Sequence, residues 1–142
     1  KPFFSKKYTM KLNQKQIDEI LARKPESRNK YFVRTVVAEE EIWGLADEEG
    51  WLLLEVEENG AEAMAVFPNP EFAEAFREAG EFHDFEVEAL DLMEFLEWLE
   101  DFENEQISVA VFPTPDFQSA VMPPERLKAD FQEEFQKEED KA

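Results

Sequence analysis

Two segments of the chain nearly repeat each other, and each places a proline directly after a short apolar run. AVFPNPEFAEAF begins at Ala65, and AVFPTPDFQSAV begins at Ala110. Because proline cannot donate a hydrogen bond to a neighbouring strand, a strand within a sheet should stop at each VFP triplet. We therefore interpret the repeats as two strand ends. A duplicated binding site is the alternative, but strand-end prolines and helix caps need no function to explain them.

The residues after the two repeats differ, and they predict different structures. After the first repeat, Asn69 is a favourable N-cap, Pro70 suits the first helical position, and Gly80 ends the apolar pattern. We expect a helix there. After the second repeat, Pro123 comes only nine residues after Thr114, and the FQSAVM segment between them favours a strand. We expect this copy to turn back as a hairpin.

A three-stranded antiparallel meander is predicted ahead of and into the first repeat. Its strands are expected at residues 41–46, 51–57 and 61–67. The DEEG segment at 47–50 and the Asn59–Gly60 pair separate them, and Asn-Gly is a strong signal for a two-residue hairpin turn. Along the middle strand, Leu52, Leu54 and Val56 alternate with Leu53 and Glu55. This alternation is typical of a strand with one buried face.

Capping patterns predict helices elsewhere in the chain. Asn13 with Gln16, and Asp91 with Glu94, have the spacing of a capping box, and Pro25 is suited to open a second N-terminal helix. The fold class is therefore a single α+β domain, with a mixed sheet that contains the meander and about five helices, two of them N-terminal. The expected boundaries are 1–9 for an N-terminal extension, 10–136 for the domain and 137–142 for a charged C-terminal tail.

The net charge of −20 is unevenly distributed. Residues 1–37 hold ten Lys or Arg and three acids, whereas residues 38–142 hold five Lys or Arg and 32 acids. Direct nucleic-acid binding by the acidic part is not expected, because phosphate contacts need a basic face. A solubilising surface is the simpler interpretation of the acidity. The alternatives are a face for a basic partner or a mimic of nucleic acid, and the basic segment also permits salt-sensitive self-association.

Composition also indicates the cellular compartment in which the protein is expected. The chain has no cysteine, so disulfides and thiolate metal sites are excluded. Its apolar runs, such as WLLL at 51–54, are far shorter than the roughly 20 residues that span a bilayer. The basic start has no apolar h-region, so we expect no signal peptide. The expectation is a cytoplasmic protein with no membrane partner.

Catalytic motifs are not found. No serine lies in a G-x-S-x-G context, and four glycines are too few for the usual phosphate-cradling loops. The one histidine, His83, shares the parity of Phe85 and Val87, so we expect a partly buried structural histidine. A general base or half of a metal site is the alternative. We expect no enzyme activity, no cofactor and no metal.

Aromatic residues supply the remaining site candidates. Tryptophans can line a recognition groove, because they are enriched at binding hot spots, but packing in the core is the more frequent role of large aromatic side chains. The two repeats each add a phenylalanine at the strand end. The candidate interaction or pocket residues are Trp43, Trp51, His83, Trp98, Phe67 and Phe112.

Several motifs in fixed order carry a resemblance: KYFVRTVVAEEEIWGL, EGWLLL, AVFPNPEFAEAF, LDLMEFLEWL and VAVFPTPD…VMPPERLKADF. Together they resemble the uncharacterised bacterial domain-of-unknown-function family 2750, over about Met10 to Phe135. The resemblance implies a small soluble bacterial protein with one α+β domain, and it implies no activity or catalytic residues. The order of elements is also similar to the N-terminal domain of SseB-type proteins, which are associated with protein–protein roles.

The leading hypothesis is a non-enzymatic protein-interaction or regulatory module. It is based on the missing catalytic motifs, the many aromatic residues and the charge asymmetry. One alternative is an inhibitor of a basic protein that mimics nucleic acid. The other is a small-ligand binder or enzyme that uses His83 and nearby carboxylates.

Overall fold

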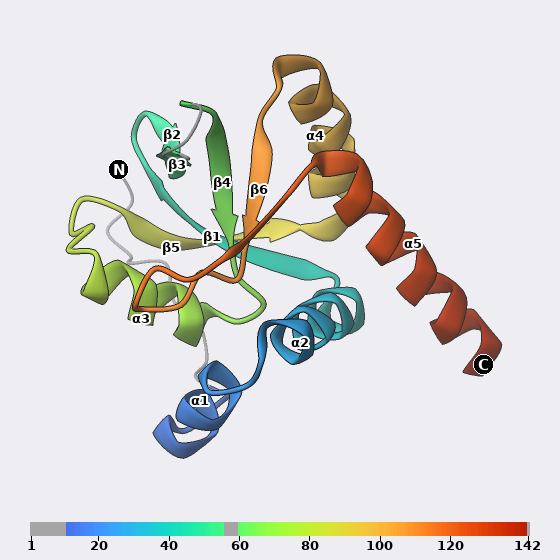
Figure 1. The fold of residues 1–142 in the computed structure, drawn as a ribbon, viewed down its shortest axis with the longest axis horizontal. Helices are drawn as coiled ribbons and strands as arrows, with labels where there is room; N and C mark the ends of the chain where they lie inside the picture. Colours follow the sequence, from blue (N-terminus) through green and yellow to red (C-terminus); the bar gives the residue numbers. More distant parts are fainter. Residues whose placement is uncertain (1–10, 56–59, 142) are drawn as a thin grey trace, which may run out of the picture.

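A computed structural model of the chain describes residues 11–55 and 60–141, which form five helices and seven strands (Figure 1). The helices are α1 (Gln14–Leu21), α2 (Pro25–Glu39), α3 (Pro70–Ala79), α4 (Leu92–Glu105) and α5 (Pro124–Lys141). The strands are β1 (Glu41–Asp47), β2 (Gly50–Trp51), β3 (Leu53–Glu55), β4 (Glu62–Val66), β5 (Glu86–Asp91), β6 (Ser108–Val111) and β7 (Ala120–Met122). The α+β class is confirmed. The extension at 1–9, the predicted strand end at 56–57, which includes Val56, and Asn59 of the predicted turn lie outside the described residues.

The predicted helix starts are confirmed, although their chemistry differs. At α1 the Asn13 side chain accepts from the backbone N–H of Gln16, whose side chain accepts from the Asn13 N–H, so both halves of the capping box form. At α4 the Asp91 carboxylate accepts from the N–H groups of Met93 and Glu94. At α3 the Asn69 side chain makes no such bond to its helix.

The strands form two sheets that meet at one antiparallel bridge. The first sheet has the order β2-β1-β5, and the second has the order β3-β4-β6-β7. At the bridge, Trp43 and Phe67 exchange two backbone hydrogen bonds with N···O distances of 2.9 and 2.7 Å. In Figure 1, β1 and β4 diverge from this meeting point. The two sheets are therefore joined directly at the bridge, and β1 and β4 are not paired beyond it.

The predicted meander is confirmed, but its middle strand is divided at Leu52. The Leu52 N–H donates to the Leu45 carbonyl at 2.8 Å, and the Leu52 carbonyl accepts from the Ala65 N–H at 3.4 Å. Leu52 therefore bonds to both sheets, with β2 before it on β1 and β3 after it on β4. The sequence pattern did not predict this transfer, because the alternation of buried and exposed side chains continues through Leu52.

The two near-repeats lie side by side on parallel strands. Ala65 of β4 pairs with Ala110 of β6, Val66 pairs with Val111, and the Phe112 N–H donates to the Val66 carbonyl at 2.8 Å. Equivalent letters of the repeats are thus at the same level in the sheet. After the two repeats the structures differ as predicted. Helix α3 follows the first repeat, and the second repeat forms the antiparallel β6–β7 hairpin.

The core is rich in phenylalanine and links the helices to the sheets. Helix α5 packs on α2, α4 and β6, and the rings of Phe32 and Phe131 lie 6.1 Å apart between α2 and α5. Near the repeats, the ring centroids of Phe72 and Phe112 are 4.7 Å apart. Helix α5 continues to Lys141, so the charged segment expected as a tail is helical through that residue. Among the described residues, no helix has the length and apolar character needed to cross a bilayer.

Truncation of Phe131 should strongly destabilise the protein. Its side chain is fully buried against α2, so Phe131→Ala removes a large apolar group and leaves a cavity. We expect a loss of about 3–5 kcal/mol in the free energy of unfolding, measured by urea denaturation. Met93→Ala is the control, because Met93 is 62% exposed on α4 and should change stability by less than about 0.5 kcal/mol. Equal losses in the two variants would contradict this description of the core.

Candidate functional site

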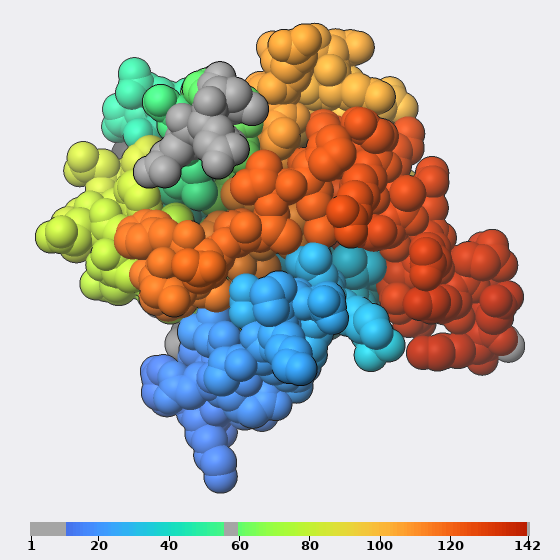
Figure 2. Space-filling view, in the orientation of Figure 1, coloured from blue at the N-terminus to red at the C-terminus, as the bar shows by residue number. Residues whose placement is uncertain are grey.

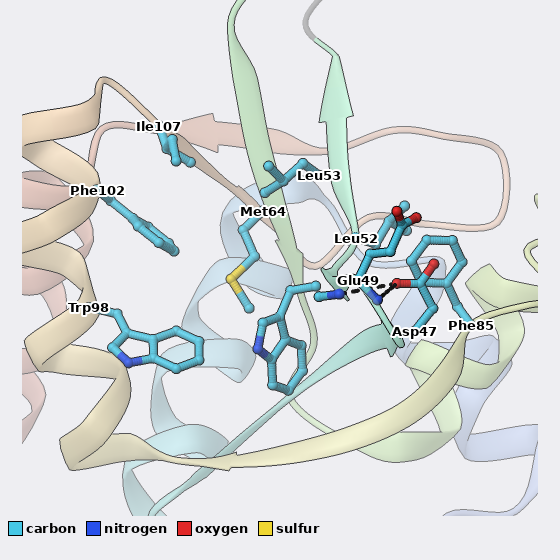
Figure 3. Close-up of a pocket in the computed structure, with 11 residues that line it drawn as sticks. Asp47, Glu49, Leu52, Leu53, Met64, Phe85, Trp98, Phe102 and Ile107 are labelled. Atoms are coloured by element: carbon cyan, nitrogen blue, oxygen red, sulfur yellow. Dashed lines mark hydrogen bonds between the residues drawn. The ribbon is translucent and has the colours of Figure 1, made fainter.

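An apolar groove of about 450 Å³ lies between α4 and the strand segment that crosses between the two sheets. Figure 3 shows Trp98 and Phe102 projecting from α4 toward Met64 of β4, with Leu53 and Ile107 along the upper side. The main apolar side chains that line it are Trp51, Leu53, Met64, Trp98, Phe102 and Ile107. Leu53 is 37% exposed, so part of its apolar surface faces solvent.

The two tryptophans of the groove contact each other edge to face. The Trp51 and Trp98 ring centroids are 6.0 Å apart, with an interplanar angle of 70°. Trp98 and Phe102 are four residues apart on α4, so they share the same helix face. Trp51 lies over Gly44 of the neighbouring strand, where a Cβ atom would be only 3.0 Å from two carbons of the indole ring. The absence of a side chain at Gly44 therefore makes room for Trp51.

The ends of the groove are acidic. At one end, the Asp47 carboxylate accepts from the backbone N–H groups of Glu49 and Gly50 and so forms the turn between β1 and β2. At the other end, Ile107 is shared with a second open hollow that is lined by Glu62 and Glu105. Among the described residues that line these two hollows, four are acidic and none is Lys or Arg.

Only two of the six candidates from the sequence line the groove. Trp51 and Trp98 form the aromatic pair of the groove. Trp43 is partly buried against the core and does not line the groove. Phe67 and Phe112 are fully buried: Phe67 packs on Phe76 and Phe112 on Phe72, so both serve the core.

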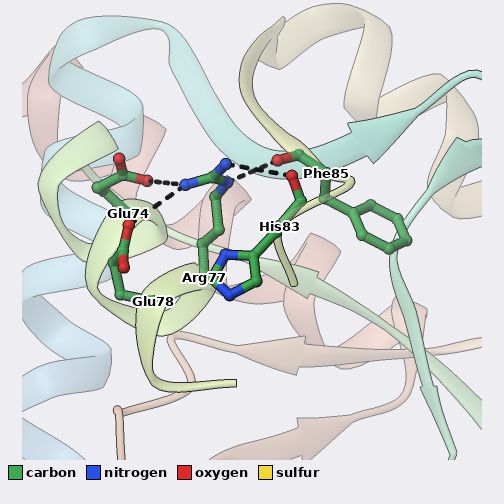
Figure 4. Close-up of polar contacts among 5 residues, drawn as sticks. All are labelled: Glu74, Arg77, Glu78, His83 and Phe85. Carbon is green, nitrogen blue, oxygen red and sulfur yellow. Dashed lines mark hydrogen bonds and ion pairs between the residues drawn. The ribbon is translucent and has the colours of Figure 1, made fainter. Parts of the chain in front are cut away.

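His83 lies apart from the groove on an exposed turn, and the expectation of a partly buried histidine was wrong. The parity argument failed because β5 begins only at Glu86, after this turn. The turn is fixed through its backbone, since the Arg77 side chain donates to the carbonyls of His83 and Phe85 at 3.3 and 2.6 Å (Figure 4). Arg77 also forms ion pairs with Glu74 and Glu78, each at 3.4 Å.

Metal chemistry receives no support from the geometry. Within residues 11–55 and 60–141, no three His, Cys, Asp or Glu side chains gather in a way that could hold a metal ion. The sequence contains no histidine besides His83 that could add an imidazole ligand.

A set of buried polar residues at the carboxyl ends of β4 and β6 was missed by the sequence analysis. Its members are Arg28, Asn69, Glu71 and Thr114. The Tyr31 hydroxyl donates to the Asn69 side-chain oxygen at 2.7 Å, which explains why Asn69 does not cap α3. The Glu71 carboxylate accepts from the backbone N–H groups of Lys11 and Leu12 at 2.7 and 2.8 Å. The local pattern assigned Asn69 to the cap of the helix, whereas Tyr31 of α2 uses its side chain.

Gly44→Ala should disturb the tryptophan pair. The added methyl group would press on the Trp51 ring, which must shift by a few tenths of an ångström away from its present contact. We expect an altered near-UV circular dichroism spectrum between 280 and roughly 300 nm, the region of tryptophan absorption, because edge-to-face pairs are sensitive to geometry. Ser108→Ala on β6 is the control, since Ser108 does not line the groove. Identical spectra for the two variants would show that Gly44 does not position Trp51.

Tyr31 should titrate later than an ordinary tyrosine. Burial raises the pKa of its hydroxyl, and the neutral form donates to Asn69. Because the unfolded chain loses this proton first, the free energy of unfolding should fall as the pH rises from about 10 through the folded pKa. The chain has two tyrosines, so Tyr8→Phe leaves Tyr31 as the only phenol in an absorbance titration. Equal midpoints in buffer and in urea would contradict the raised pKa.

The comparisons with known proteins identify a family but no activity. The model of the family described as "Protein of unknown function (DUF2750)" matches residues 29–131, which include the strands of both repeats and the groove. A comparison with curated proteins gives no match. The likeness to SseB-type domains stays a prediction. Since the family match covers more than half of the chain, this protein belongs to the DUF2750 family of proteins of unknown function.

Proposed function

We propose that this protein is a non-enzymatic interaction module, and that its groove binds a segment of a partner protein with an apolar anchor flanked by Lys or Arg. Two features of the groove together carry the proposal. The groove contains an aromatic pair, and every charged residue among the described residues that line it or the neighbouring hollow is acidic. With it we retain the expectations of a bacterial, cytoplasmic protein that uses no cofactor.

The apolar anchor is argued from the side chains of the groove. Trp51 and Trp98 are only partly buried although their rings touch, so each still has apolar surface to cover. Tryptophan is among the residues that most often dominate binding energy, because it offers a large rigid area. A volume of about 450 Å³ is within the range of pockets that accept compact ligands, and it suits one or two large side chains.

The basic flanks are argued from charge. Glu49 lies at one end of the groove, and Glu62 and Glu105 lie at the neighbouring hollow. An acidic rim attracts a basic partner, repels acidic ones and fixes the orientation of the bound segment. The net charge of −20 adds a long-range attraction for any basic protein, so the apolar anchor is what must supply specificity.

Peptide selection tests this proposal directly. A library of random 12-residue peptides would be selected against the immobilised full chain at a sodium chloride concentration of about 150 mM, where exposed charges more than about 8 Å apart are screened. We expect the enriched sequences to share an aromatic or aliphatic residue with Lys or Arg on either side. A selected peptide, labelled with fluorescein, should bind at least tenfold more weakly to Trp98→Ala in an anisotropy titration.

Matched variants separate groove binding from general charge attraction. Glu49→Lys should weaken binding several-fold, whereas Glu138→Lys, an exposed change of equal charge on α5, should have a smaller effect. Met93→Ala should bind as the parent does. Enriched peptides without basic residues, or equal binding by Trp98→Ala, would reject the proposal. If a DNA-binding protein displaces the peptide from the chain, and added DNA reverses this displacement, the result would instead favour the nucleic-acid mimic.

A further inference from the structure

Arg28 is a buried cation with an unused hydrogen-bond donor. It lies in the first turns of α2, and its side chain is only 9% exposed. One nitrogen, Nη1, donates to the Arg23 carbonyl at 2.7 Å, but the buried Nε has no partner. No ion pair among the described residues includes Arg28. Buried charges are normally paired, because leaving water without compensation is costly.

A small cavity of about 110 Å³ adjoins this guanidinium. It lies between the first turns of α2 and the segment that returns from β6 to β7, and Figure 2 shows that segment in orange directly against α2 in blue. Besides Arg28, its polar walls are the side chains of Asn29, Gln118 and Ser119. By volume it has room for about four water molecules, which is enough space for a carboxylate or phosphate group.

The surroundings favour a negative ligand. Pro25, the first residue of α2, lines the cavity, so the positive end of this 15-residue helix is at its wall. Lys24 precedes that helix, and the described acids do not line the cavity. In a chain with 35 acids and 15 bases, this is a local reversal of the overall charge.

We propose that the Arg28 cavity binds a small oxyanion, namely the carboxylate or phosphate group of a small molecule. Only Nη1 of the Arg28 guanidinium has a hydrogen-bond partner among the described residues, so the group keeps N–H donors and its full charge for the oxygens of such a ligand. The Asn29 and Gln118 amides supply further donors, whereas the Ser119 hydroxyl already donates to the Val111 carbonyl. The site is separate from the groove, and it does not depend on the groove's function.

Nuclear magnetic resonance of the arginine Nε–H groups reads the site directly. The full chain has five arginines, and Arg28→Lys identifies the Arg28 signal by its loss. The probes are sodium phosphate and sodium acetate, each added at constant ionic strength with sodium chloride. We expect the Arg28 Nε–H signal to shift and saturate with at least one probe, while the other four signals change much less. Saturation by phosphate alone assigns a phosphate-bearing ligand, and saturation by acetate alone assigns a carboxylate.

A cavity-filling variant keeps the test decisive if Arg28→Lys does not fold. Ala120→Leu occupies the cavity and leaves Arg28 in place, so the apparent Kd for the effective probe should rise at least tenfold. The matched control is Val121→Leu, because Val121 is exposed and does not line the cavity. An Arg28 signal that neither probe shifts at 50 mM or so, or binding that Ala120→Leu leaves intact, would overturn the proposal.

Discussion

The bridge between Trp43 and Phe67 determines how the rest of the structure is arranged. Two backbone hydrogen bonds join the sheets there, and β1 and β4 separate on one side of it. The strand segment around Leu52 occupies the opening and bonds to both sheets. This places Trp51 and Leu53 opposite α4, where the aromatic groove forms. A flat continuous sheet would have paired this segment along its whole length and left no such opening.

The two proposed sites differ in physical character and lie on different parts of the chain. The groove is open, aromatic and acidic at its ends, which suits a large partner with mobile basic side chains. The Arg28 cavity is small and carries a positive charge at its wall, which suits a few oxygen atoms held at fixed positions. The charge asymmetry of the sequence therefore has a counterpart in space, because α2 belongs to the basic first quarter and the groove to the acidic remainder.

Local rules predicted local structure well, and they failed where distant segments decide. Asn13, Asp91 and the turn at Asp47 behave as expected because caps and tight turns are satisfied within a few residues. The parallel pairing of the repeats was not predictable, since a proline shows where a strand stops but not which strand lies beside it. The burial of Arg28 was equally hidden, because a basic residue in a polar helix normally faces water. The contact between Trp51 and Trp98, on which the candidate groove depends, also joins segments that no local pattern relates.

The parallel alignment of the two repeats has a consequence for how the chain reaches this structure. Ala65 to Phe67 and Ala110 to Phe112 are identical in sequence, so these triplets could exchange places with the same buried side chains, whereas the buried pair Met64 and Val109 differs. Correct assembly must therefore be selected by residues outside the triplets: Met64 or Val109 before them, and after them the helix that starts at Pro70 or the tight turn in which Thr114 and Gln118 bond to each other. A sheet with β4 and β6 in exchanged positions would be a compact kinetic trap. The chain could leave this trap only if both strands detached from the sheet. The residues that flank the identical triplets thus specify the position of each strand in the sheet.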